Sequence, residues 1–530
     1  MTVLSRIQKH REWIAISGAM LGAFLAVLDI VITNAAIKDI QGALSATFDE
    51  ASLISTAYLV AEIIVIPLSG WLMKMLSMRR YFLISCGLFT FSSLLCSFAW
   101  NLESMIVFRV LQGFGGGALV PLGFTIIMTM LPLKQRAMGM ALFAFTATTA
   151  PALGPTLGGW LVEQFSWHYI FYINLPAGIL MMAMLSYGLD KTRPDWSQLR
   201  HGDYTGILTM AIGLGSLEVM LEMGRRVNWF ESDLIISLAL ISFTSLATFI
   251  FIELRSDNPL INLRLLKQKN FALASLSNIL MGYGLFGTVF VLPLYLAGVH
   301  GYNSMQIGIV FMWMGLPQLL LLPIVPRLMT HIEPRYLVSI GFALFSVSCY
   351  MNTGLNSNFA GEQLIIPQLL RALGQPLAMV PIIVIATQQV ALKDVASASS
   401  LFNLLRKLGG ALGIALLATI LQTRRSTHFA HINETVNVIS TQTQAHMASL
   451  SQSLLELGTA PTLVEQQTLV LVAELIQREA SIMAFSDTMF LLGAGLALAS
   501  VFILPAGLKS ESHTEDTAMD QAPAQVVAQN

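Results

Sequence analysis

The chain has 530 residues, of which 55% are hydrophobic and only 11% are charged. A soluble globular protein carries about 25% charged residues, so this composition excludes an ordinary cytosolic enzyme, a disordered chain and a secreted disulfide scaffold. The net charge of −1 also gives no basis for nucleic-acid binding, which needs a basic surface. We therefore expect a protein that is embedded in a lipid bilayer.

Apolar segments long enough to cross a bilayer, about 20 residues each, recur along the whole chain. Six of them lie before residue 190, a further pair follows, and six more fill the remainder of the chain. The sequence therefore predicts an all-α membrane protein with fourteen transmembrane helices. We expect these helices near residues 13–35, 51–73, 81–100, 103–131, 137–162, 168–189, 204–223, 234–253, 271–296, 304–326, 335–355, 362–388, 396–422 and 483–506.

The charges in the loops predict the orientation. Most lysine and arginine residues of the loops lie on the side of the membrane that holds the N-terminus. Because positively charged loops stay inside, both termini should be cytoplasmic. The first apolar segment is too long for a cleaved signal peptide and lacks a small-residue cleavage site. The expected parts are a cytoplasmic N-terminus (1–12), a six-helix half (13–189), two additional helices with loops (190–270), a second six-helix half (271–506) with an outer insert near 423–482, and a cytoplasmic tail (507–530).

Two short patterns of the first half recur in the second half. The Arg-Tyr pair at Arg80 recurs at Arg335, and the Gly-rich pattern that begins at Gly154 recurs at Gly409 with the same separation. Many membrane transporters are built from such repeats. The separation predicts two related six-helix halves with the additional pair of helices between them.

Three ionisable residues lie deep inside predicted membrane helices, where a charge costs about 2.5–3.5 kcal/mol. Asp29 and Arg109 lie at a similar depth below the outer ends of their helices, so they could face each other. They form either a fixed ion pair that locks two helices or a protonatable site that the arginine modulates. Glu62 has no evident partner at its depth, and we expect it to carry a proton.

Other charged residues of the membrane segments have weaker interpretations. Glu218 and Glu222 share one helix face towards the outer end of their helix, and we expect them at the membrane interface. Arg406 is a candidate for a central cavity. Its neighbour Lys407 should instead reach the membrane surface or cap a helix.

The segment 137–162 is unusually rich in proline and glycine, including Gly154, Pro155, Gly158 and Gly159. Proline bends a helix and glycine permits close approach of a neighbouring helix, so the composition alone predicts a packing seam. The histidines are scattered, and the sequence lacks a phosphate-binding G-x-x-x-x-G-K-[ST] loop. We therefore expect no enzyme and no cofactor, and the energy should come from an ion gradient or from a partner protein.

Five groups of residues together resemble the major facilitator superfamily, and within it the fourteen-helix drug:proton antiporter branch called EmrB/QacA. The most branch-specific segment runs from Trp167 through Asn174 to Gly178. One departure is the loop after the second helix, which lacks the acidic residue common in the wider superfamily. The other resembling segments are 28–37, 57–72, 109–113 and 154–159.

The resemblance implies a fold of two pseudo-symmetric six-helix halves that rock against each other. It also implies a proton-coupled exporter of amphipathic or hydrophobic small molecules, with Asp29 and Glu62 as proton carriers and Arg109 as their modulator. The glycines and proline of 154–159 then form the antiporter motif. Possible cavity residues are Asn34, Gln112 and Arg406.

The long insert resembles the EmrB side of the branch, whose members work with a periplasmic adaptor and an outer-membrane channel. That resemblance implies the inner membrane of a Gram-negative bacterium, with drugs, toxic amphipaths and lipids as the small-molecule contacts. One alternative is a dedicated exporter of a single metabolite such as a fatty acid or siderophore. Another is a membrane receptor or scaffold that transports nothing.

The insert itself contains two stretches with helical spacing of apolar residues. Leu450, Leu454 and Leu455 form the first stretch, and residues 469–476 form the second. Two short helices with apolar faces outside the membrane need a cover. They either fold back as a cap on the transporter or provide a docking surface for the adaptor.

Overall fold

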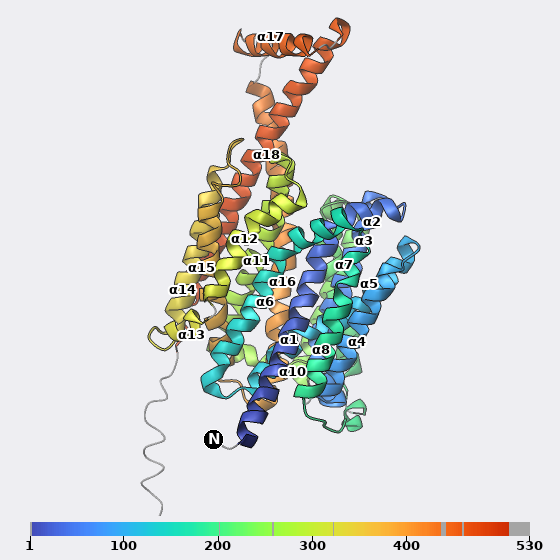
Figure 1. The fold of residues 1–530 in the computed structure, drawn as a ribbon, viewed down its shortest axis with the longest axis vertical. Helices are drawn as coiled ribbons and strands as arrows, with labels where there is room; N and C mark the ends of the chain where they lie inside the picture. The colour runs from blue at the N-terminus through green and yellow to red at the C-terminus, as the bar shows by residue number, and fades with distance from the viewer. Residues whose placement is uncertain are drawn as a thin grey trace, which may run out of the picture.

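The computed structural model describes residues 3–200, 202–256, 259–321, 323–435, 441–457 and 460–507. Within these residues every regular element is a helix, and the long helices run roughly side by side in one bundle (Figure 1). Many large apolar side chains are exposed on the outside of the bundle, among them Phe91, Phe243 and Leu320. An exposed apolar surface of this extent suits lipid rather than water. The all-helical membrane fold is therefore confirmed.

The first half of the chain forms a bundle of six long segments, in which the short α2 follows α1 and the short α7 precedes α8. Its second long helix begins with a capping box, in which Thr47 accepts a hydrogen bond from the backbone N–H of Glu50 and the Glu50 carboxylate accepts one from Thr47. The helices are α1 (Val3–Ala35), the short α2 (Ile37–Ala43), α3 (Phe48–Leu76), α4 (Met78–Ser97), α5 (Leu102–Met130), α6 (Leu133–Gln164), α7 (Tyr169–Tyr172) and α8 (Asn174–Gly188).

The second half repeats this pattern of packing. Helix α1 packs on α5, α6 and α8, and α11 packs in the same way on α15, α16 and α18. Likewise α4 packs on α5 and α8, as α14 packs on α15 and α18. The helices of this half are α11 (Lys269–His300), α12 (Ser304–Leu321), α13 (Ile324–Leu328), α14 (Pro334–Met351), α15 (Ile365–Thr387), α16 (Val395–Thr435), α17 (Thr441–Glu456) and α18 (Pro461–Phe502).

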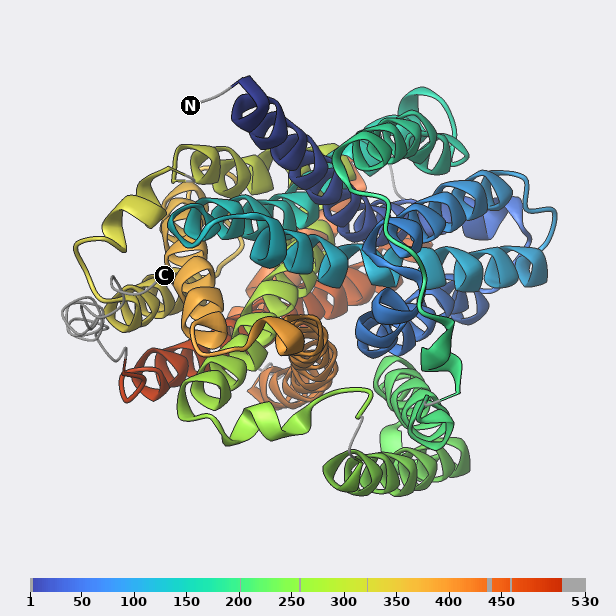
Figure 2. The ribbon, with the colours of Figure 1, turned by 90° about the horizontal axis from the view of Figure 1, so that it is seen from below.

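The additional pair consists of α9 (Tyr204–Met223) and α10 (Asp233–Arg255). The two helices pack on each other, and α9 also contacts α3 and α16. Only 17% of the most apolar stretch of α10 is buried inside the protein, so this helix lies at the periphery (Figure 2). The pair is central in the sequence but lateral in space. Short 3-10 turns lie at Trp196–Leu199, Trp229–Glu231, Leu263–Lys267, Asn352–Gly354 and Leu392–Asp394.

Twelve helices of the described residues are long and apolar enough to cross a membrane. A thirteenth span is formed if the two parts of α6, Gln135–Pro151 and Leu153–Gln164, are counted together despite the 45° bend between them. The expected span 304–326 corresponds to α12 and α13, and residue 322 between them lies outside the described residues. The count of fourteen stays a prediction.

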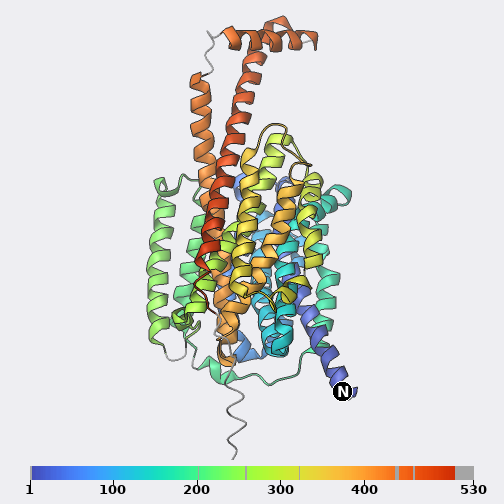
Figure 3. The same cartoon turned by 90° about the vertical axis from the view of Figure 1, so that its left-hand side faces the viewer.

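The outer insert differs from the prediction of two short helices. Helices α16 and α18 are 41 and 42 residues long and continue well beyond the bundle as a projecting pair, and α17 lies across the far end of this pair (Figure 3). The stretch 469–476 is therefore part of the last long helix. The sequence showed its helical spacing, but not that it continues without a break into the membrane segment. The N-terminus lies at the opposite end of the molecule, and the expected tail from residue 508 onward is outside the described residues.

Candidate functional site

Asp29 lies on α1 inside the first half and is 2% exposed. Its Oδ2 atom accepts a hydrogen bond of 2.5 Å from Nη1 of Arg109 on α5, and both side chains are buried. The structure thus brings together the two residues that the sequence placed at a similar depth. A buried ion pair of this kind recovers its desolvation cost only with good geometry and further hydrogen bonds.

The second carboxylate oxygen of Asp29 has two further donors. Nε2 of Gln112 donates to Oδ1 at 2.9 Å, and Nδ2 of Asn174 donates to the same atom at 2.8 Å. Asn174 also donates to the hydroxyl of Ser93 at 3.0 Å. Four helices therefore meet at this site, because Asp29, Gln112, Ser93 and Asn174 lie on α1, α5, α4 and α8.

The guanidinium of Arg109 also contacts two aromatic rings and the side-chain amide of Gln112. It lies 4.5 Å from the ring centroid of Tyr58 and 5.9 Å from that of Phe171. Its Nη1 also donates to Oε1 of Gln112 at 2.6 Å. Its Nη2 has no hydrogen-bond partner among the described residues. The cluster is thus a compact, water-excluding site around one acid and one base.

Glu62 has a partner, contrary to the expectation from the sequence. Its Oε2 lies 2.7 Å from Nζ of Lys407 on α16, and the two side chains are only 4% and 14% exposed. Lys407 therefore neither caps a helix nor reaches the membrane surface, and its ammonium lies 5.3 Å from the ring centroid of Phe286. The sequence missed this pair because its members come from opposite halves of the chain.

Glu218 is also placed differently from the expectation. It is 4% exposed on α9, where the sequence predicted a position at the membrane interface. It lies within electrostatic range of both Lys407 and Glu62. The lateral helix α9 thus contributes a second carboxyl group beside the ion pair that joins the two halves.

The glycines of the predicted antiporter motif form contacts on two sides of α6. A Cβ atom at Gly154 would lie 2.5 Å from Cγ1 of Val31 on α1, and one at Gly158 would lie 3.1 Å from Cβ of Ala35. A Cβ atom at Gly159 would lie 2.5 Å from Cβ of Ser304, which is on α12 of the other half. These glycines permit close packing within one half and across the boundary. Pro155 lies between them in the bent helix.

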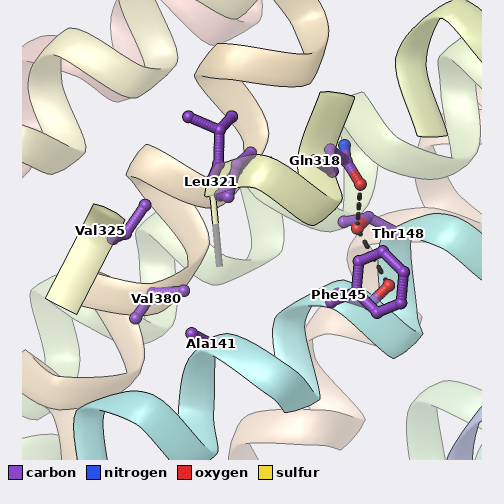
Figure 4. A pocket seen from close by; sticks show the side chains of 8 residues that line it. Ala141, Phe145, Thr148, Gln318, Leu321, Val325 and Val380 are labelled. Carbon is purple, nitrogen blue, oxygen red and sulfur yellow. Dashed lines mark hydrogen bonds between the residues drawn. The ribbon is translucent and has the colours of Figure 1, made fainter. Parts of the chain in front are cut away.

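A chain of polar side chains crosses the boundary between the halves nearly two helical turns before this motif. The hydroxyl of Thr148 on α6 donates to Oε1 of Gln318 on α12 at 2.6 Å, and Nε2 of Gln318 donates to Oε1 of Gln375 on α15 at 3.0 Å. Thr148 and Gln318 line a pocket with otherwise apolar walls, which include Phe145 and Leu321 (Figure 4).

A second cavity lies next to the first, with Thr148 in both walls. Its volume of about 30 Å³ is enough for water but not for a drug-sized molecule. Arg406, a predicted cavity residue, lines it together with Arg371. The other two predicted cavity residues lie elsewhere. Gln112 is fully buried beside Asp29, and Asn34 is exposed and accepts a hydrogen bond of 2.5 Å from Ser55.

The chain resembles known transporters over most of its length. Residues 19–414 match the family model of the Major Facilitator Superfamily. The chain is 31% identical to the multidrug export protein EmrB of Escherichia coli (strain K12), an alignment that covers 90% of this chain and 92% of that protein. It is 32% identical to the fatty acid resistance protein FarB of Neisseria gonorrhoeae, with coverage of 93% and 95%. The solved structure of the proton:xylose symporter XylE matches with a TM-score of 0.58 at 12% identity over 94% of this chain and 96% of that one, which shows the fold.

Proposed function

Because the chain belongs to the major facilitator superfamily, we propose that it exports hydrophobic and amphipathic small molecules in exchange for protons. It is a multi-pass membrane transporter, and the similarity to a multidrug export protein over nine-tenths of both chains supports drug efflux. The observation that carries the coupling proposal is the fully enclosed carboxylate of Asp29. A carboxylate costs several kcal/mol to bury, so a site that keeps one in the membrane usually uses it.

Asp29 and Glu62 are the proposed proton carriers, and each has one cationic partner. Arg109 neutralises Asp29 within the first half, whereas Lys407 neutralises Glu62 across the boundary. When the halves separate, Glu62 loses its cation in a low-dielectric environment and takes up a proton. When they close again, Lys407 displaces that proton. Rocking of the halves is thereby coupled to protonation, with the α6 motif as the seam.

The proposal also covers the location and the partners of the protein. We place the chain in the inner membrane with both termini cytoplasmic. The N-terminus and the end of the described chain at Gly507, which accepts a hydrogen bond from Asn270 at the start of α11, lie at the same end of the bundle. The projecting α16–α18 pair would then lie in the periplasm. Exposed apolar residues on it support docking of an adaptor protein that leads to an outer-membrane channel. They include Leu463, Leu469, Val470 and Leu475.

Expression in a strain that lacks its own drug exporters tests the efflux proposal. We expect the minimal inhibitory concentration of several unrelated hydrophobic compounds to rise. Unchanged susceptibility to the whole panel would contradict efflux. Resistance to fatty acids alone would instead favour a dedicated exporter, the alternative that the similarity to FarB supports.

Substrate-driven proton movement in proteoliposomes tests the coupling, with a compound from that panel as substrate. Asp29→Asn keeps the size and hydrogen bonding of the side chain but removes its charge, and we expect proton movement to be lost. Asp190→Asn is the matched control, because Asp190 also pairs with an arginine, Arg11 at 3.0 Å, but is 81% exposed. Equal proton movement in the two variants would exclude Asp29 as a carrier.

A further inference from the structure

Arg371 on α15 is buried without a counterion. It is 1% exposed, and none of its three guanidinium nitrogens has a hydrogen-bond partner among the described residues. Its neighbours are the rings of Phe311 and Phe345, each with its centroid 5.6 Å away. Arg109, at the corresponding place in the first half, is neutralised by Asp29. An unpaired buried charge is among the most costly features of a folded protein.

Arg406 on α16 is in a similar position. It is 8% exposed, and its Nη1 has no hydrogen-bond partner among the described residues. Its Nη2 donates to Oδ1 of Asn403 at 2.8 Å, which orients the guanidinium without neutralising it. The acid within electrostatic range is Glu62, and that carboxylate already pairs with Lys407.

Both arginines line the same cavity between the halves. The rest of its wall is almost entirely apolar and comes from α1 and α6 on one side and α11 on the other. Two cationic side chains with free donors in an apolar wall fit the two parts of an amphipathic anion, namely a charged head and an apolar body. The other lining residues are Val27, Ala147, Thr148, Pro151, Leu285, Phe286 and Val289.

We propose that Arg371 and Arg406 bind the acidic head group of an amphipathic organic anion, a carboxylate or sulfonate, in the cavity between the two halves. The proposal rests on the proposed export function and specifies its substrate class. The cavity of about 30 Å³ has room only for water, so the anion enters when the halves move apart. The anion then supplies the counterion that Arg371 lacks, which makes its binding favourable in a low-dielectric site.

Two fluorescent probes with the same ring system separate charge from hydrophobicity. The probes are 1-anilinonaphthalene-8-sulfonate, which is anionic, and N-phenyl-1-naphthylamine, which lacks the sulfonate. Binding of each is measured to the full-length protein in nanodiscs, with empty nanodiscs subtracted. We expect Arg371→Gln and Arg406→Gln each to weaken binding of the anionic probe about tenfold or more, as loss of a charged hydrogen bond does. Binding of the neutral probe should change by less than about twofold.

Three results would overturn the proposal. They are equal binding of both probes to the wild-type protein, equal loss of both probes in the variants, and unchanged binding of the anionic probe. Lys393→Gln, at an exposed position outside this cavity, controls for a general loss of positive charge. Export of neutral compounds by both arginine variants would show that the export proposal stands even if the anion site does not.

Thermal unfolding gives a second readout that does not depend on the probes. Because Arg371 is an unpaired buried charge, Arg371→Gln should raise the melting temperature while it weakens anion binding. The anionic probe should stabilise the wild-type protein more than the variant. A lower melting temperature for Arg371→Gln would mean that the arginine is already satisfied in the resting protein, which contradicts its role as an open anion site.

Discussion

Glu62 on α3 and Lys407 on α16 form an ion pair of 2.7 Å that joins the two halves of the protein beside the lateral helix α9. Separation of the halves must break this pair, since its members move with different halves. Once the pair is broken, each charge loses the counterion that it has in the structure. The pair therefore favours the closed arrangement and links opening to the protonation of Glu62.

A double-mutant cycle on this pair should show strong coupling. Glu62→Gln and Lys407→Met each leave one buried charge alone, which costs about 3–5 kcal/mol. The double variant leaves neither, so its stability should exceed that expected from adding the two single losses. Thermal unfolding of the purified variants provides the measurement. The exposed pair Glu333–Arg335 at 2.6 Å is the control and should show coupling of about 0–1 kcal/mol. Additive losses at Glu62 and Lys407 would show that the two charges do not interact.

Removal of the Arg109 charge should change both stability and pH dependence. Arg109→Gln leaves Asp29 buried without its cation, and a buried carboxyl group without a cation favours its neutral form. We expect the pH profile of transport to move towards alkaline values and the protein to lose about 3–5 kcal/mol at neutral pH. Transport in proteoliposomes across a pH series measures the first effect. Arg11→Gln, which breaks an exposed pair, should leave the profile in place. A lower rate without a shifted profile would identify the Asp29–Arg109 pair as purely structural.

The close packing of α6 on α12 can be tested with one substitution that introduces a steric clash and a second that removes it. Gly159→Ala places a methyl group against Cβ of Ser304, and overpacking of this kind costs about 1–3 kcal/mol. We expect export to fall. Ser304→Gly removes the opposing Cβ atom and should restore export in the double variant. Gly298→Ala meets no atom within 4 Å and should behave as the wild type. Failure of the second substitution to restore export would show that the loss arises elsewhere than at this contact.

The projecting pair should be needed in cells but not in vesicles. Deletion of residues 426–480 removes the exposed apolar surface that we assign to adaptor docking and leaves the bundle. Resistance of intact cells should be lost, because the compound is no longer passed across the outer membrane. Transport in inverted membrane vesicles should persist, since only one membrane has to be crossed there.

A second variant with only two substitutions controls for misfolding of the deletion variant. Leu469 and Val470 are exposed apolar residues on the projecting part of α18, and serine at both positions leaves the helix intact. Reduced resistance with normal vesicle transport would again support docking. Equal loss of vesicle transport in both variants would show that the projection serves transport itself.

The sequence predicted the features that depend on local composition. The apolar segments predicted nearly all membrane helices, because about 20 apolar residues in a row are stable only as a helix in lipid. Asp29 and Arg109 were identified because charges are rare inside such segments, and their equal depth predicted their contact. The sequence did not predict that Asn174 donates a hydrogen bond to Asp29, although Asn174 lies in the branch-specific segment and is an amide in an apolar helix. A polar amide inside an apolar helix indicates a buried hydrogen bond, but the sequence does not show that its acceptor is Asp29.

Features that depend on packing between distant helices could not be predicted. Glu62 and Lys407 lie far apart in the chain, and depth alone does not show which helix faces cross the boundary. Glu218 is buried because α9 packs its charged face against α3 and α16, whereas its position along the helix suggested an interface. The missing counterion of Arg371 is likewise visible only once its surroundings are known.

Helix α16 connects the interior to the far end of the projection as one continuous helix. Its 41 residues contain no proline and extend about 60 Å at about 1.5 Å per residue. Lys407 lies about a third of the way along the helix from Val395, and Thr435 is the last residue. A tilt of α16 that pulls Lys407 away from Glu62 must therefore swing Thr435 through a larger arc, as a lever does. A protein bound to the projection would be displaced in each transport cycle. Conversely, a bound protein that prevents this displacement would hold the halves closed.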